Sequence, residues 1–137
     1  VFNNAAISIN NDAGTILTFN SERYDTDSIH STVSNTSRLT ANTPGVYIIA
    51  GHIEWGANTT GYRDFYIYLN GATILAENYV LANTALVGQV FQNLSTIYQL
   101  SVNDYVELKV QQNSGGALNV ASFASRSPEF SMQKIAD

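Results

Sequence analysis

Several residue types are missing or scarce in this chain of 137 residues. It has no cysteine, which excludes a thiol nucleophile and a disulfide framework. Only 12% of the residues are charged, and six basic residues stand against eleven acidic ones, for a net charge of −5. Nucleic-acid binding needs clustered basic side chains, and those present here are scattered along the chain. We therefore expect no nucleic-acid partner.

Long apolar runs are also missing. No stretch approaches the roughly 18 consecutive apolar residues of a membrane span, so we expect no membrane insertion. The N-terminus lacks the basic and then apolar pattern of a signal peptide. The chain begins at Val1 rather than at methionine, which suggests a processed product or a domain cut from a longer protein. The length and a hydrophobic content of 45% predict one globular domain, residues 1–137.

What the chain does contain is a strand-and-turn pattern from end to end. Val, Ile, Tyr, Phe and Thr recur, and Asn, Gly, Ser and Asp interrupt them at short intervals. No segment shows a convincing amphipathic helix with caps. The pattern predicts an all-β protein whose ten strands span residues 5–9, 15–20, 37–41, 45–56, 63–69, 73–80, 86–100, 105–111, 117–121 and 129–135.

Two of these expected strands are apolar on both faces. From Val46 to Ala50 every residue is apolar, and between Leu86 and Leu100 apolar residues also alternate onto both faces. An antiparallel strand with one solvent-exposed face should alternate apolar and polar residues, so both strands need a second cover. A loop of the same chain could supply this cover. Other copies of the chain are the favoured interpretation.

Alternation shows which residues of these strands share a face, but not which face is inside. Tyr47, Ile49, Ile53 and Trp55 are the larger set on the first strand and are expected to fill the core. The opposite faces are then predicted to contact other copies through Ile48, Ala50, His52, Val87, Phe91 and Ile97.

Tyrosines dominate the polar face of another strand. Phe65, Ile67 and Leu69 alternate with polar residues, and Asn70-Gly71 then predicts a hairpin, because both positions favour positive φ. Aromatic rings beside amide and carboxylate groups can hold sugars or peptides, although cross-strand packing explains exposed tyrosines equally simply. The candidate ligand-binding residues are Tyr62, Asp64, Tyr66, Tyr68 and Asn70.

The rest of the sequence contains few candidate metal-binding or catalytic residues. Asp25 and Asp27 alternate with hydroxyl residues as calcium ligands do, but the Gly and Glu of an EF-hand are missing, and capping of a turn explains the same residues. We therefore expect no cofactor, with calcium as the open alternative. His30 is interpreted as a solvated side chain. No nucleophile elbow, phosphate loop or zinc-protease motif is present, so we expect no catalytic residues and no enzyme.

The chain resembles the complement component 1q-type globular head, one of the tumour necrosis factor-like jelly rolls. Pro44 to Tyr47 is similar to the Gly-x-Tyr that precedes the family's long apolar strand. Leu100 to Leu108 is similar to its Leu-x-x-Gly-Asp-x-Val-x-Leu, with Asn103 in place of the Gly, and Ser127 to Met132 resembles the closing strand. The resemblance implies a ten-stranded jelly-roll β-sandwich of two antiparallel sheets, assembled as a homotrimer.

The departures from the family pattern also carry information. Ile49 stands where the family usually has Phe, Met132 stands where it commonly has Gly, and the animal cysteines are absent. These differences resemble the divergent heads of bacterial, spore-surface and phage fibres, which implies an extracellular place on a cell, spore or virion surface. The expected function is a non-enzymatic trimeric head that binds a glycan or protein through exposed loops and its outer sheet. The alternative is a trimerisation cap for a stalk, with no ligand.

Overall fold

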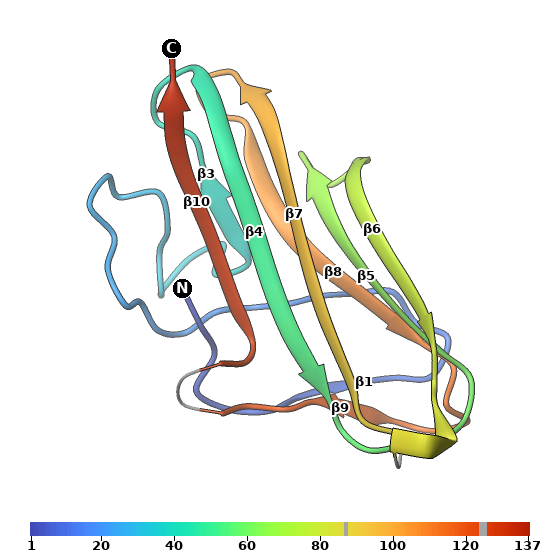
Figure 1. The fold of residues 1–137 in the computed structure, drawn as a ribbon. Helices are drawn as coiled ribbons and strands as arrows, with labels where there is room; N and C mark the ends of the chain where they lie inside the picture. The colour runs from blue at the N-terminus through green and yellow to red at the C-terminus, as the bar shows by residue number, and fades with distance from the viewer. Residues whose placement is uncertain (87, 124–125) are drawn as a thin grey trace.

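The computed structural model describes residues 1–86, 88–123 and 126–137. It confirms the all-β prediction and the ten strands, in the expected order (Figure 1). The strands are β1 (Ile7–Ile9), β2 (Thr15–Ile16), β3 (Arg38–Thr40), β4 (Gly45–Trp55), β5 (Tyr62–Leu69), β6 (Thr73–Leu81), β7 (Val90–Leu100), β8 (Tyr105–Gln112), β9 (Leu118–Val120) and β10 (Glu129–Ala136).

One antiparallel sheet is built around β4. β10 pairs with one edge of β4 and β7 pairs with the other over its whole length, while β9 pairs with β1 and meets β4 at Trp55. In Figure 1, β10, β4 and β7 run side by side across the front of the molecule. Of the two strands predicted to be apolar on both faces, β4 is therefore the central strand of its sheet, and β7 is its neighbour.

The second antiparallel sheet lies behind the first and is built around β8. β5 pairs with one edge of β8 and carries β6 on its far side, whereas β2 and β3 both pair with the other edge of β8. In Figure 1, β8 passes behind the first sheet and β5 and β6 lie to the right of β7, in keeping with a two-layer sandwich.

The core fills the space between the two sheets. The first sheet contributes Tyr47, Ile49, Ile53 and Trp55, all nearly fully buried, and thus confirms the expected inner face of β4. From β5, Phe65 and Ile67 face them, again as alternation predicted. Gly51 lies on the same inner face, where a Cβ would come within 2.7 Å of a Leu108 methyl group, so the residue without a side chain leaves room for Leu108 of the other sheet.

Two predicted turns form, and two of the expected strands differ most from their observed bounds. Asn70 and Gly71 both have positive φ, 52° and 70°, and join β5 to β6 as an antiparallel pair. Asn103 also has a positive φ, 69°, which fits its place in the turn before β8. The strand expected from residue 86 begins only at Val90, after a short 3-10 helix (Thr84–Leu86), and the strand expected over 15–20 keeps only two residues.

Candidate functional site

The outer surface of the sheet around β4 is the first candidate, and we call it the β4 face. Pairing places Ile48 opposite Ile97, Ala50 opposite Ser95 and Glu54 opposite Phe91. The predicted contact residues Ile48, Ala50, His52, Phe91 and Ile97 thus share one face, pointing away from the core, and Val87 lies outside the described residues. The face comprises Val46, Ile48, Ala50, His52, the buried Glu54, Phe91, Asn93, Ser95, Ile97, Gln99, Glu129, Ser131 and Gln133.

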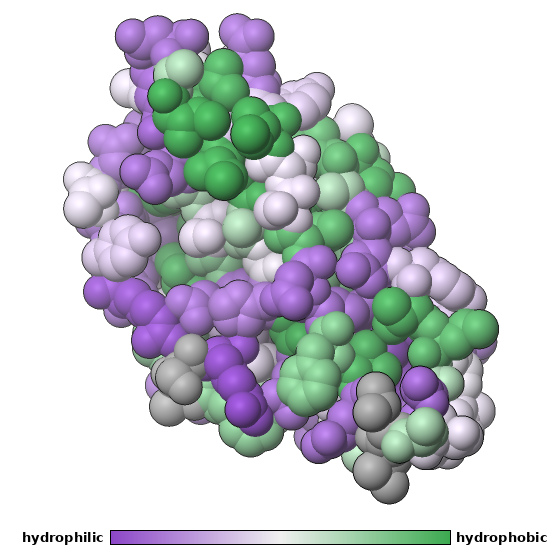
Figure 2. All heavy atoms as spheres, viewed as in Figure 1, coloured by the Kyte–Doolittle hydropathy of each residue, from purple (hydrophilic) through white to green (hydrophobic). Residues whose placement is uncertain are grey.

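Apolar side chains on this face are exposed in the single chain. Ile48 is 40% exposed, Phe91 57% and Ile97 61%. Figure 2 shows the same surface, with an apolar patch over one end of the sheet and a polar band across its middle. Contiguous exposed apolar side chains edged by polar ones are typical of a contact surface.

A hollow of about 290 Å³ lies at the centre of the β4 face. Ser131 and Ser95 lie directly opposite Ala50 on either side, so three small side chains form a row across three strands. The surface is low there because these side chains are short. The apolar patch and the polar band lie on either side of the row.

The polar band contains a charged cluster. Arg23 donates two hydrogen bonds to the Glu129 carboxylate, at 2.6 and 3.2 Å, and His52 Nε2 lies 3.5 Å from the same carboxylate. The hydrogen bond from Arg23 holds the pKa of Glu129 below its usual range. Beyond the cluster, Glu54 is buried and lies 3.1 Å from Arg126 Nε. The sequence did not indicate the partners Glu129 and Arg126, which come from distant segments.

The outer surface of the other sheet is the second candidate, and we call it the tyrosine face. Pairing places Tyr62, Asp64, Tyr66 and Tyr68 on it, as predicted. The neighbouring strands add further outward side chains, namely Arg38, Glu77, Tyr79, Tyr105, Glu107, Lys109 and Gln111.

Most groups of the tyrosine face are already paired with one another. The Lys109 ammonium lies 4.7 Å from the centre of the Tyr68 ring, and the Arg38 guanidinium lies 3.9 Å from that of Tyr105. Such cation–ring contacts hold both partners in place. The ring of Tyr62 stacks on another tyrosine, Tyr79, with centres 5.2 Å apart. The face is therefore an ordered aromatic and polar platform.

Two of the predicted ligand-binding residues are engaged inside the chain. Asp64 is 5% exposed, accepts the Phe65 N–H and receives the hydroxyl hydrogen bond of Tyr66. Asn70 lies at the turn, where its amide donates to Asp104 at 2.8 Å and accepts the Tyr105 N–H at 2.9 Å. Asp64 and Asn70 thus position the strand and turn, while the rings of Tyr62, Tyr66 and Tyr68 form the surface. Binding of a ligand by all five residues stays a prediction.

The ionisation of Tyr66 provides a pH-dependent prediction. Burial and the hydrogen bond to Asp64 raise the pKa of the Tyr66 phenol far above its ordinary value. The neutral phenol stabilises the fold fully below the ordinary tyrosine pKa, about 10, and this stability is lost as the pH rises through the higher folded-state pKa. We expect Asp64→Asn to bring Tyr66 ionisation to lower pH, measured by ultraviolet titration at alkaline pH. An unchanged Tyr66 titration in Asp64→Asn would contradict this.

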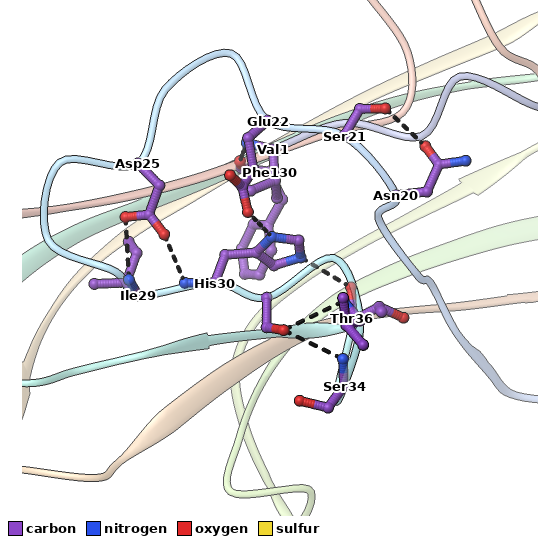
Figure 3. A network of polar contacts seen from close by, with 12 residues as sticks. Val1, Asn20, Ser21, Glu22, Asp25, Ile29, His30, Ser34, Thr36 and Phe130 are labelled. Atoms are coloured by element: carbon purple, nitrogen blue, oxygen red, sulfur yellow. Dashed lines mark hydrogen bonds and ion pairs between the residues drawn. The ribbon is translucent and has the colours of Figure 1, made fainter.

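The loop between β2 and β3 contains the predicted calcium ligands. The two carboxylate oxygens of Asp25 accept backbone N–H groups from Ile29 and His30, at 3.1 and 3.0 Å (Figure 3), and from Asp27 at 3.3 Å. These hydrogen bonds agree with the alternative interpretation, in which Asp25 caps a turn. Among the residues that the structure describes, no three His, Asp or Glu side chains gather closely enough to hold a metal ion. Calcium binding by Asp25 and Asp27 stays a prediction.

His30 differs from its expected state. Its side chain is fully buried, with Nδ1 2.8 Å from a Glu22 carboxylate oxygen and Nε2 3.2 Å from the Thr36 carbonyl oxygen (Figure 3). The interpretation as a solvated side chain is therefore wrong. The polar residues around His30 in the sequence suggested exposure, but the loop folds back on itself and encloses the ring.

The same loop borders a groove beside the β4 face. The groove has a volume of about 600 Å³ and runs between the loop and β10. Ile29, Tyr47 and Met132 give it apolar walls, whereas Asp27 and Lys134 are among its charged lining residues. In Figure 1 the loop lies beside β10, apart from the stacked strands. Because Ile48 and Ala50 also line it, the groove continues onto the β4 face.

Comparison with known proteins gives the fold. No family model matches the sequence, and no curated protein matches it. The solved structure of Eiger, a tumour necrosis factor from S. frugiperda, aligns with a TM-score of 0.63 and 14% identity over 97% of this chain and 87% of that chain. The globular domain of the zebrafish complement 1qA protein aligns with a TM-score of 0.55 and 16% identity, over 90% of this chain and 99% of that chain. The chain is thus a jelly-roll sandwich like that of tumour necrosis factor and the complement globular domain.

Proposed function

We propose that this protein is a non-enzymatic head domain that forms a homotrimer through the β4 face and presents its tyrosine face and loops to a glycan or protein ligand. The observation that carries the proposal is the exposure of Ile48, Phe91 and Ile97 on one face of the same sheet. Removing such side chains from water stabilises an assembly by about 25 cal/mol per Å² of buried apolar surface. A second copy of the chain is a partner that is always present with it.

The fold supports a trimer rather than another assembly. The resemblance to complement component 1q-type heads implies a three-fold assembly, and the two solved structures share the jelly roll. Neighbouring surfaces on one copy also differ in shape, since the groove lies on the β10 side and exposed apolar residues continue along the β7 side. Unlike surfaces that meet head to tail generate a closed ring where the rotation between copies closes, and an open filament where it does not; the proposed trimer is the closed case. Among the described residues no helix is long and apolar enough to cross a membrane.

A trimer would display three equivalent copies of the tyrosine face. Tyr62, Tyr66 and Tyr68 offer rings and hydroxyl groups that stack on and hydrogen-bond to a sugar or peptide. Three weak sites on one body bind a repetitive surface with added avidity. This arrangement suits a head that recognises a ligand outside the cell, on a cell, spore or virion surface.

A trimerisation cap without a ligand is the second candidate. One observation favours it: the tyrosine face satisfies much of its own polar and aromatic bonding, through the contacts of Tyr66 with Asp64 and of Lys109 with Tyr68. A surface that is already paired gains less from a ligand. The two candidates share the trimer and differ only in whether the tyrosine face binds anything.

The molar mass in solution tests the shared part. Light scattering at micromolar concentration should give three times the chain mass of 14.9 kDa. A mass of 14.9 kDa would overturn the trimer and the interpretation of the β4 face.

A glycan array then separates the two candidates. We expect binding by the wild-type trimer and its loss in Tyr66→Ala combined with Tyr68→Ala, with the trimer mass retained. Tyr24→Ala is the matched control, since Tyr24 is an exposed tyrosine of the loop outside the tyrosine face. Binding that needs Tyr24 instead would place the ligand on the loop, and no binding to glycans or protein ligands, together with a stalk that fails to assemble without this domain, would favour the cap.

A further inference from the structure

The charged cluster lies on the surface that the proposed trimer would cover. His52 contributes from β4, Glu129 from β10 and Arg23 from the loop between β2 and β3. In the single chain their side chains are 39%, 21% and 37% exposed, so water still reaches all three. Covering the β4 face would remove that water. The net charge of the cluster then determines how much free energy is needed to remove it from water.

That charge is set by two cations and one carboxylate. Arg23 and Glu129 together are neutral, since Arg23 holds two hydrogen bonds to the carboxylate. The Glu129 pKa is lowered, so this carboxylate stays ionised through the pH range in which histidine titrates. A neutral His52 leaves the cluster uncharged, whereas a protonated His52 leaves one positive charge that no second carboxylate of the cluster compensates.

The other carboxylates nearby already have partners. Two further carboxylates, Glu22 and Asp25, flank Arg23 in the loop and interact electrostatically with the Val1 amine; Glu22 lies 2.8 Å from His30 Nδ1, and Asp25 accepts backbone N–H groups. Glu54, two residues further along β4, is paired with Arg126 at 3.1 Å. From β7, Asn93 lies opposite His52 and is uncharged. The amino group of Val1 donates to the Phe130 carbonyl oxygen at 2.7 Å and adds positive charge, and burial lowers its pKa. Like His52, this amine gains a positive charge as the pH falls, so the test must separate the two groups.

We propose that His52 makes assembly through the β4 face pH-dependent, with protonation of its imidazole weakening the trimer. The inference depends on the proposed trimer. Three copies bring three clusters to one interface, and like charges facing one another there oppose association. The trimer therefore binds fewer protons than three separate chains. It is favoured above the ordinary histidine range and is lost as the pH falls through that range.

The test measures the trimer–monomer equilibrium of wild type and His52→Gln by sedimentation equilibrium, at about pH 7.5 and about pH 5.5, on either side of the histidine range. Glutamine keeps a hydrogen-bonding side chain that carries no charge at either pH. If protonation of each His52 weakens association by about tenfold, within the usual range for linked equilibria, three sites together lower the trimer association constant by about a thousandfold at the lower pH. We expect that change in wild type and most of it to vanish in His52→Gln.

Each outcome decides between the proposals. A wild-type trimer of equal strength at both pH values overturns the His52 inference and leaves the trimer standing. An equal pH dependence in His52→Gln also overturns it and points to another group, such as the amine of Val1. A protein that is monomeric at both pH values overturns the inference and the proposed function together. His52→Lys, charged at both pH values, should be weakened already at the higher pH.

Discussion

Ile97→Asp is expected to convert the proposed trimer into a monomer of 14.9 kDa. Ile97 is 61% exposed in the single chain, so an aspartate there should cost one subunit at most about 1 kcal/mol, the span of strand preferences. In the trimer the same carboxylate would be buried without a partner, which costs several kcal/mol per charge and occurs three times. Light scattering measures the mass, and circular dichroism checks that the strands remain.

Val33→Asp is the matched control for this substitution. Val33 is another β-branched residue and is 91% exposed, but it lies in the loop between β2 and β3 rather than on the β4 face. The same change in charge should therefore leave the trimer intact. A trimer that survives Ile97→Asp, or one that is lost equally in Val33→Asp, would show that the β4 face is not the interface.

Phe130→Ala is expected to lower the free energy of unfolding by about 3 to 5 kcal/mol, the usual cost of deleting a buried aromatic ring. Phe130 is fully buried on the inner face of β10, with its ring centre 5.7 Å from that of Phe19. Its loss leaves a cavity between the sheet and the segment before β3. Urea unfolding measures the effect, and it should be done in the Ile97→Asp background, where association does not add to stability.

Phe91→Ala tests the opposite face of the same sheet with the same substitution. Phe91 is 57% exposed on the β4 face, so in the monomeric background its loss should change stability by no more than about 0.5 kcal/mol. In the wild-type background it should instead weaken the trimer. Equal losses of monomer stability in Phe91→Ala and Phe130→Ala would contradict the assignment of the two faces.

Much of the fold could be predicted from the residue pattern of individual strands. Alternation along β5 predicted the inward Phe65 and Ile67 and the outward tyrosines, because successive side chains of a strand point to opposite faces. Asn70-Gly71 predicted the hairpin because few other residues accept positive φ at both positions. These signals are local, so sequence alone contains them.

The sites were predicted less completely, since they depend on distant partners. Asp64 was correctly placed on the outward face, but its carboxylate already accepts a hydrogen bond from the Tyr66 hydroxyl. His30 was interpreted as solvated, but Glu22 and Thr36 enclose it. Nothing near His52 in the sequence indicates that Glu129 and Arg23 are its neighbours in space. Glu129 begins the last strand, and Arg23 lies before β3. The register between strands brings such groups together.

The sequence by itself determined that the chain is all-β, that it has ten strands, and that β4 and β7 are apolar on two sides. Those properties follow from side-chain alternation and turn chemistry, which act over a few residues. Only the tertiary structure decided that Ile48, Phe91 and Ile97 point outward on one surface while Tyr47 and Phe130 point inward. The physical reason is that period-two alternation is symmetric between the two faces, and the packing of a second sheet on one of them breaks that symmetry.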